Sequence, residues 1–492
     1  MKDNVTEVPV SQTTTVPHPD HRWLAFGVLC LGALMIVLDT TIVNVALPSI
    51  RESLNFTETS LAWVVNAYIL TFGGFLLLGG RLGDLYGHRR LFLLGIALFT
   101  LASFACGLSG SQGFLVTARA VQGIGGAVAD AVALSLMMNL FTEPAERAKA
   151  MGVFGFVCAG GGSVGVLLGG LLTSALSWHW VFLVNVPLGV LVAVLTLRLL
   201  PATRNQEAQR HLDAGGAITV TVALLLAVYA VINGNAAGWT SARTLGLLVV
   251  ALVLFALFLA IEARVRAPLM PLRLFRLRNL STANAVGVLW AAAMFAWFFL
   301  SALYMQLVLG YSPMQVGLAF LPANIIMAAF SVGLSAKLVM RFGYRPPLVC
   351  GLVLAAVGLL LFARAPLHGN FLLDVLPGMI LLGTGAGIAF NPVLMAAMND
   401  VAPSESGLAS GIVNTSFMMG GALGLAVLAS LAAARTGGLL TSGHDQLVSL
   451  NGGYRMAFFA GASCAALAAT LGAVFLRGRT AISTHDAEPV KP

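Results

Sequence analysis

The sequence predicts an all-α polytopic membrane protein. Of its 492 residues, 58% are hydrophobic and only 9% are charged, and the mean hydropathy is +0.91. A soluble globular domain carries about 25% charged residues, so the composition alone argues against that class. Two further observations agree. Apolar stretches long enough to cross a bilayer recur along the chain, and most of the basic residues fall on one side of them.

Fourteen apolar stretches meet the length requirement for a transmembrane helix, which is about 20 residues for a hydrocarbon core of about 30 Å. They are residues 23–47, 61–80, 91–109, 112–140, 148–172, 179–200, 214–233, 244–263, 281–307, 314–336, 346–364, 371–397, 406–433 and 456–476. We therefore expect 14 transmembrane helices.

The arginines and lysines predict the orientation of these spans. With the N-terminus in the cytoplasm, 21 of the 27 Lys and Arg residues fall on the cytoplasmic side, five fall outside and Arg119 lies within a span. Because cytoplasmic loops of membrane proteins are enriched in Lys and Arg, we expect both termini in the cytoplasm. The net charge of +8 follows this sidedness and does not indicate nucleic-acid binding. Residues 1–22 lack the apolar core of a secretory signal, and we expect them to be disordered.

An internal repeat predicts the domain organisation. Residues 79–89 (GGRLGDLYGHR) align with residues 335–345 (SAKLVMRFGYR), and the two segments join spans 2 to 3 and spans 10 to 11. This shift of eight spans implies two six-span halves with two inserted spans, a plan typical of secondary transporters. We expect an N-terminal half at 23–200, a linker with the inserted helices at 201–280, a C-terminal half at 281–477 and a cytoplasmic tail at 478–492.

The sequence gives no support for catalysis or for an ATP-driven pump. The five cysteines lie in apolar segments without metal-ligand spacing, and we find no nucleotide-binding loop, metal constellation or nucleophile–base pair. We therefore expect no enzymatic activity, no metal and no cofactor. An ion gradient is then the expected source of energy.

Asp39 and Arg119 are charged residues inside predicted spans, where an ionised side chain costs several kcal/mol. They lie about eight and seven residues from the outer ends of spans 1 and 4, or about 12 and 10 Å deep at 1.5 Å per residue. The matched depths predict a contact. A guanidinium favours the ionised carboxylate and burial favours the neutral one, so relative motion of the two helices would change the affinity for protons. The alternative is a static ion pair that fixes helix packing.

Asp130 is a third charge within the spans, 11 residues after Arg119. Eleven steps of about 100° return to nearly the same helix face, about 16 Å further along. Arg119, Gly123, Ala127 and Asp130 therefore form one stripe, which we expect to face a central cavity. A carboxylate there would hold a cationic substrate or a second proton. The alternative is an ion pair with a base on the cytoplasmic side.

Glycines spaced four apart on spans 5 and 13 predict close packing, because they let two helix backbones approach. They are Gly161, Gly165, Gly169 and the adjacent Gly170 in span 5, and Gly420 and Gly424 in span 13. We expect these faces to form a close sliding contact between the two halves.

Several segments together resemble one family. Residues 80–90 (GRLGDLYGHRR) resemble the signature loop between spans 2 and 3 of the major facilitator superfamily, and residues 38–48 (LDTTIVNVALP) resemble the first-span motif of its 14-span drug:proton antiporter family. Residues 119–126 (RAVQGIGG) and 178–189 (WHWVFLVNVPLG) resemble its fourth-span motif and the beginning of its sixth span. The resemblance covers about residues 22–477 and implies a major facilitator fold with two inserted central helices.

The resemblance also implies roles for individual residues. In the family, the acid and the base at the positions of Asp39 and Arg119 take part in proton coupling, and the loop between spans 2 and 3 is a conformational latch. The expected latch residues are Gly80, Asp84, Gly87, Arg89, Arg90, Arg341 and Arg345; a plain topogenic charge cluster is the alternative. Antiporters of the family normally have a Gly-Pro pair in span 5. Here the pair is Gly165-Val166, so we expect no kink there.

Polar and aromatic side chains inside the spans are candidates for lining a substrate cavity. Most buried polar groups of this kind form hydrogen bonds between helices, and aromatic residues suit a promiscuous apolar pocket. The candidates are Asn44, Asn66, Tyr68, Gln122, Asp130, Trp297, Asn391 and Asn414.

The sequence thus predicts a proton-coupled exporter of amphiphilic, often cationic drugs or toxic metabolites. We expect a monomer in the bacterial cytoplasmic membrane, with small molecules, protons and the lipid bilayer as its partners. Two alternatives stay open. One is a dedicated exporter of a single natural product or lipid-like metabolite, and the other is a non-transporting membrane receptor or scaffold, which would show no proton-dependent flux.

Overall fold

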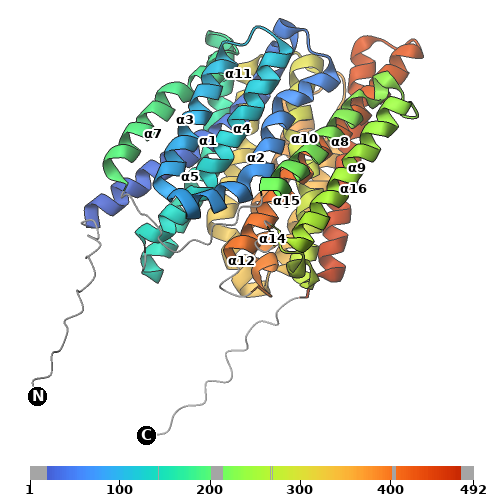
Figure 1. Cartoon of the computed structure of the whole chain (residues 1–492). Helices are drawn as coiled ribbons and strands as arrows, with labels where there is room; N and C mark the ends of the chain where they lie inside the picture. The colour runs from blue at the N-terminus through green and yellow to red at the C-terminus, as the bar shows by residue number, and fades with distance from the viewer. Residues whose placement is uncertain are drawn as a thin grey trace, which may run out of the picture.

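The computed structural model describes residues 19–141, 143–200, 214–265, 268, 270–401 and 406–477. In these ranges the chain is helical and has no β-strand, and Figure 1 shows the long helices side by side in one bundle. Residues 19–22, predicted to be disordered, already belong to the first helix. The rest of the predicted N-terminal segment and the tail at 478–492 lie outside the described residues.

Seven helices make up the first part of the chain, which we call the N half. They are α1 (Pro19–Leu54), α2 (Glu58–Tyr86), α3 (His88–Gly107), α4 (Gln112–Leu140), α5 (Pro144–Ala175), α6 (Trp180–Leu183) and α7 (Asn185–Leu199). Two long helices, α8 (Ala214–Ala237) and α9 (Ala242–Arg264), follow at the position of the predicted insertion.

The remaining elements begin with the short helix η1 (Leu272–Arg276), and we call those after it the C half. They are α10 (Arg278–Leu303), η2 (Tyr304–Val308), α11 (Pro313–Ala329), η3 (Phe330–Leu334), α12 (Ser335–Phe342), α13 (Arg345–Phe362), η4 (Phe371–Val375), α14 (Leu376–Met398), α15 (Ser406–Thr441) and α16 (Gln446–Phe475). The segments η2, η3 and η4 are π-helical.

The number of spans is confirmed in part. Among the described residues, 12 helices are long and apolar enough to cross a membrane, and two shorter apolar helices cover Val164–Ala175 and Pro313–Ala329. These two lie in the predicted fifth and tenth spans. Each belongs to a longer helical stretch, since α5 begins at Pro144 and α11 continues through η3 into α12. Helices therefore occupy all 14 predicted positions, and 12 meet the length criterion by themselves.

The internal repeat is visible in the backbone. Gly87 ends α2 with φ 95° and Gly343 ends α12 with φ 75°, a region that favours glycine. The next crossing repeats as well. A Cβ built on Gly95 of α3 would lie 2.6 Å from the Ala129 nitrogen of α4, and one built on Gly351 of α13 would lie 3.0 Å from the Ala389 nitrogen of α14. The helix pairs α3–α4 and α13–α14 thus cross in the same way.

The two halves pack against each other through α2 with α15 and through α5 with α11, and hydrogen bonds join them at one end of the bundle. The Gln306 side chain of η2 donates to the Val45 carbonyl of α1 at 2.9 Å, and the Met314 amide of α11 donates to the Ser174 hydroxyl of α5 at 3.2 Å. Gly170 lies beside this second contact, because a Cβ added to it would be 2.7 Å from the Pro313 carbonyl oxygen. We call this the closed end.

The glycine stripes pack differently from the prediction. Gly161, Gly165 and Gly169 face Leu34, Leu38 and Ile42 of α1, which belongs to the same half. Gly420 and Gly424 face Val288 and Ala292 of α10, again within one half. The expected contact between the halves is therefore wrong for these five glycines and is present for Gly170. Gly170 follows Gly169 directly, so it points about 100° away from the stripe and reaches the other half.

The helix α8 lies against both halves. It packs on α2 and on α15, and its green ribbon crosses in front of them in Figure 1. On α2, its Thr221 occupies the space where a side chain at Gly74 would lie. On α15, the Asn235 amide donates to the Ser430 carbonyl at 2.7 Å. The inserted helix is therefore an integral part of the bundle.

Candidate functional site

Asp39 is the centre of a buried polar cluster in the N half. Its side chain is 0% exposed. One carboxylate oxygen, Oδ2, accepts a hydrogen bond from Arg119 Nη1 at 2.5 Å. The other, Oδ1, accepts from Gln122 Nε2 at 2.8 Å and from Asn185 Nδ2 at 3.0 Å. The contact predicted between Asp39 and Arg119 is present, and three donors converge on one carboxylate.

Arg119 is held from several sides. Its Nε donates to the Val64 carbonyl of α2 at 2.9 Å, and its Nη1 donates to Gln122 Oε1 at 2.7 Å. The guanidinium carbon lies 4.3 Å from the centre of the Tyr68 ring and 5.6 Å from that of Phe182. An aromatic face attracts a cation, so these rings partly replace the water that a guanidinium loses on burial. The side chain is only 1% exposed.

Ser103 of α3 ties the cluster together. Its hydroxyl donates to the Phe182 carbonyl at 2.9 Å and accepts from Gln122 and from Asn185, each at 3.1 Å. Neither Ser103 nor Asn185 was predicted to belong to the site. Asn185 lies in the segment that resembles the beginning of the sixth span, and this resemblance could have pointed to it. Ser103 lies in no motif that could have predicted its place in the site. Every N-half helix except α5 thus contributes to the surroundings of Asp39.

Asp130 lies away from this cluster. It is partly buried on α4, and no base pairs with it among the side chains that the structure describes. Tyr68 lies between the two acids, because its ring is beside Arg119 and its hydroxyl is 2.9 Å from a Cβ built on Gly126, one turn before Asp130. The Tyr68 hydroxyl is buried and has no hydrogen-bond partner in the described part of the chain.

The predicted stripe on α4 is turned toward a neighbouring helix. A Cβ on Gly123 would lie 2.4 Å from the Tyr68 carbonyl of α2, and one on Gly79 of α2 would lie 3.2 Å from the Ala127 carbonyl. The middle of the stripe therefore packs on α2, and the expectation that it faces a cavity is wrong there. Close packing of small residues favours such helix contacts.

Four other cavity candidates are buried or half-buried among the helices. Asn44 is buried and donates to the Thr40 carbonyl of its own helix at 3.1 Å. Asn66 is fully buried, and neither of its amide atoms has a partner within the described ranges. Trp297 is 1% exposed and packs on Phe298 and Phe320. Asn391, half-buried, donates to the Ser331 carbonyl at 2.8 Å.

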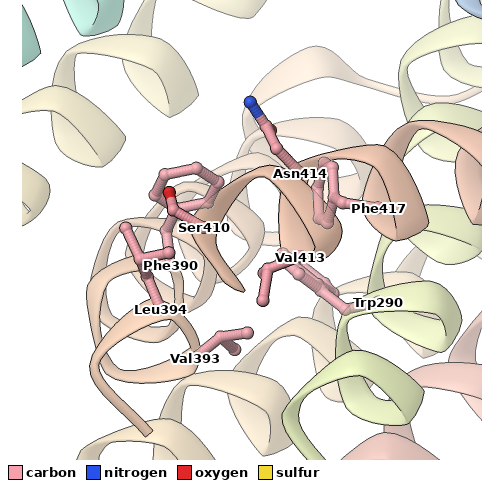
Figure 2. Close-up of a pocket in the computed structure, with 8 residues that line it drawn as sticks. All are labelled: Trp290, Phe390, Val393, Leu394, Ser410, Val413, Asn414 and Phe417. Carbon is pink, nitrogen blue, oxygen red and sulfur yellow. The ribbon is translucent and has the colours of Figure 1, made fainter. Parts of the chain in front are cut away.

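Asn414 lines a pocket in the C half. The pocket has a volume of about 180 Å³ and lies between α10, α14 and α15. Figure 2 shows its lining residues, which are Trp290, Phe390, Val393, Leu394, Ser410, Val413, Asn414 and Phe417. Phe390 is 48% exposed and opens one side of the pocket, whereas Trp290 is 1% exposed. The pocket therefore has aromatic and apolar walls with two polar side chains.

Two of the loop arginines contact helices of their own half. Arg89 donates to the Leu197 carbonyl near the end of α7 at 2.6 Å, and Arg345, its counterpart in the repeat, donates to the Ala473 carbonyl near the end of α16. Arg90 and Arg341 are exposed. The Asp84 side chain lies outside the described residues, and a Cβ on Gly80 would meet nothing within 4 Å. For the described arginines, a latch between halves stays a prediction.

Comparison with known proteins places the chain in a family. The sequence model of the Major Facilitator Superfamily matches residues 29–425 and 334–490 of the chain. The chain is 37% identical to the puromycin resistance protein pur8 of Streptomyces alboniger over 97% of this chain and 96% of that protein. It is 38% identical to the cephamycin export protein CmcT of Amycolatopsis lactamdurans over 84% and 86% of the two chains.

A third relative agrees with this result, and two solved structures share the fold. The multidrug resistance protein Stp of Mycobacterium tuberculosis is 39% identical over 82% of this chain and 74% of its own. The structure of the POT family transporter PepTSo matches with a TM-score of 0.68 at 15% identity, covering 93% of this chain and 98% of that one. The human organic anion transporter MFSD10 matches with a TM-score of 0.62 at 17% identity, covering 93% and 100%. The chain belongs to the Major Facilitator Superfamily.

Proposed function

We propose that this protein exports amphiphilic drugs or toxic metabolites, often cationic, in exchange for protons. Three curated relatives are named for antibiotic or multidrug resistance or for export, and they support export of small molecules. Proton exchange rests on the N half, where a carboxylate with no exposed surface faces Arg119 deep inside a predicted span. We further propose a monomer in the bacterial cytoplasmic membrane, organised as two halves of six spans each, with α8 and α9 inserted between them.

The buried Asp39 carboxylate carries this proposal. Ionisable groups at membrane depth are costly and mark proton or substrate pathways. Protonation of Asp39 would remove the negative charge that strengthens the hydrogen bonds from Arg119, Gln122 and Asn185, so these bonds would weaken. These donors come from α4 and α7, whereas Asp39 is on α1. Taking up a proton would therefore loosen the packing of α1 against its neighbours.

The orientation of the bundle in the membrane predicts from which side the substrate and the proton enter. The basic residues predict that the ends of α2, α12 and α14 near Tyr86, Phe342 and Met398 face the cytoplasm. The closed end is opposite, since Gln306 and Ser174 lie on the other side of the spans. We infer that the substrate is collected from the cytoplasm and that proton uptake by Asp39 from outside accompanies the return from the outward-open state.

A second candidate is a dedicated exporter of one natural product. The relative that matches over 97% of this chain is named for resistance to puromycin alone, whereas Stp is named for multidrug resistance. A transport panel separates the two. Proteoliposomes that contain a multidrug exporter are expected to take up ethidium, rhodamine 6G and tetraphenylphosphonium alike. Proteoliposomes that contain a dedicated exporter are expected to take up none of these dyes and one antibiotic of a panel.

Proton exchange is tested in proteoliposomes with an imposed pH gradient. An acidic lumen is expected to drive uptake of the transported compound and to release protons, and Asp39→Asn is expected to abolish both. Glu52→Gln, which removes an exposed carboxylate, is the matched control and retains flux. If the wild type shows no proton-dependent flux for any dye or antibiotic of the panel, the proposal fails and a non-transporting receptor or scaffold becomes the better interpretation.

Asp130→Asn in the same assay tests the second acid, and unchanged flux of every compound would remove Asp130 from the mechanism.

A further inference from the structure

We infer that the inserted helices α8 and α9 are fixed to the C half and move with it, while α2 of the N half slides along α8 during the transport cycle. This inference rests on the proposed function, in which the two halves change their relative position. It gives the two inserted spans a role, and it follows from the different contacts that α8 makes with α15 and with α2.

Helices α8 and α9 form one unit. They pack along each other, and Arg243 of α9 donates to the Tyr229 hydroxyl of α8 at 3.0 Å. Where the chain turns between them, the Trp239 ring lies against Gly234, and its Nε1 donates to Asn235 Oδ1 at 2.9 Å. A contact that holds α8 in place therefore holds α9 as well.

Hydrogen bonds fix α8 to α15 of the C half. The Asn235 amide donates to the Ser430 carbonyl at 2.7 Å and to the Ser430 hydroxyl at 3.0 Å. The same hydroxyl donates back to the Val231 carbonyl of α8 at 3.1 Å. These bonds have a directional geometry, and the hydrocarbon of the bilayer offers no water that could replace them. This contact therefore resists sliding.

Apolar packing extends the attachment to the other end of α8. Val220 of α8, Phe258 of α9 and Met419 of α15 belong to one cluster of buried side chains. The connection from α9 to the C half is also tied down, because the Met270 amide donates to the Glu262 carboxylate of α9 at 3.0 Å. The inserted pair is thus joined to the C half near both ends of α8 and through the connecting chain.

The contacts between α8 and α2 are of another kind. The Thr221 side chain fills the space over Gly74 of α2, but its hydroxyl donates to the Ala217 carbonyl of α8 itself at 2.7 Å. Ala217 in turn packs on Leu78 of α2. Neither of these two contacts with α2 is a hydrogen bond. Movement of α2 along α8 would exchange one van der Waals contact for another.

Gly73 and Gly74 give α2 a smooth face toward both neighbours. A Cβ built on Gly73 would lie 3.0 Å from Met418 Cβ of α15, and one built on Gly74 would meet Thr221 of α8. Small residues let helix backbones approach closely, and a glycine has no side chain that would interlock with the facing helix. The two adjacent glycines therefore place α15 and α8 side by side on one surface of α2.

The inference is tested by two cross-links in a chain whose five native cysteines are replaced by alanine. Leu78→Cys with Ala217→Cys joins α2 to α8, and Val220→Cys with Met419→Cys joins α8 to α15; the side chains of each pair share a buried cluster. A short bifunctional thiosulfonate links each pair, and dithiothreitol releases it. Because transport requires one half to move against the other, we expect the first cross-link to lower flux in proteoliposomes about tenfold and the second to leave it within about twofold. Equal losses, or a loss from the second cross-link alone, overturn the inference.

Spin labels follow the same motion without any flux. Tyr86 of α2, Val222 of α8 and Val427 of α15 are exposed, and labelled cysteines replace two of them at a time in protein in nanodiscs. Between acidic and basic buffer, we expect the distance from Val222 to Val427 to stay constant and the distance from Val222 to Tyr86 to change. The reverse pattern, or two constant distances, overturns the inference. Since this measurement needs no transport, its failure is distinguishable from a failure of proton-coupled flux.

Asn235 and Asn233 provide a matched pair of variants on α8. The Asn233 amide donates to the Tyr229 carbonyl of its own helix at 2.9 Å, whereas the Asn235 amide reaches α15. We expect Asn235→Leu to broaden the distribution of distances between labels at Val222 and Val427, and Asn233→Leu to leave it narrow. Equal widths in the two variants would show that these hydrogen bonds do not hold α8 on the C half, which also overturns the inference.

Discussion

Arg119 Nη1 lies 2.5 Å from Asp39 Oδ2, and neither side chain is more than 1% exposed. Removing one member of such a pair leaves a buried charge without a partner, which typically costs about 3–5 kcal/mol. We therefore expect Arg119→Gln to lower the midpoint of thermal unfolding in detergent strongly. The double variant Asp39→Asn with Arg119→Gln should recover part of this loss because it buries no charge. A double variant as unstable as Arg119→Gln alone would show that the ion pair is not the source of the cost.

Asn185 supplies one of the three donors to Asp39, and replacing it by leucine should change the proton dependence of transport. Without this donor the ionised carboxylate is less favoured. We expect the pH at half-maximal flux to move upward in Asn185→Leu, whereas Asp39→Asn abolishes proton-dependent flux altogether. The comparison requires flux measured across a series of pH values. A midpoint unchanged from the wild type would remove Asn185 from the proton site.

Gly169 and Gly162 form a matched pair on α5. A Cβ on Gly169 would lie 2.5 Å from the Ile42 carbonyl oxygen, whereas the nearest atom to one on Gly162 is 3.9 Å away. We expect Gly169→Ala to destabilise the protein by about 1–3 kcal/mol, the usual cost of overpacking, and Gly162→Ala to be tolerated. Thermal unfolding of both variants checks this, and equal midpoints would contradict the close packing of α1 on α5.

Gly170 tests the closed end. A Cβ there would lie 2.7 Å from the Pro313 carbonyl oxygen of the other half, so Gly170→Ala should open this end without unfolding either half. Cross-linking between Ser174→Cys and Met314→Cys reports the opening, because these residues touch in the closed end. We expect a lower cross-linking yield in Gly170→Ala. Gly113→Ala is the control, since a Cβ at that position meets nothing within 4 Å.

His179 lies just before the α6 helix, and its ring stacks on Trp178 with centroids 3.7 Å apart. Burial lowers the pKa of His179 below its usual value of 6.5. The unfolded chain then binds more protons than the native one below about pH 6.5, so acidification reduces the stability of the fold. We expect the thermal midpoint to fall less between pH 7.5 and pH 5 in His179→Gln than in the wild type. Identical slopes would show that another group dominates.

The sequence by itself determined the positions of the spans, the internal repeat and the depth of Asp39 and Arg119. These follow from hydrophobicity, charge sidedness and the rise per residue, which are properties of one helix at a time. For the same reason the sequence correctly predicted that the two charges meet, since only one base shared the depth of the acid.

Only the tertiary structure decided which helix each face meets. Asn185 reaches Asp39 across 146 residues, the glycine stripes pack within the halves, and the α4 stripe turns toward α2. Periodicity fixes which residues share a face of a helix, but the rotation of that helix in the bundle depends on packing against several neighbours at once. The pocket around Trp290 depends on three helices, so no pattern along one of them could predict it.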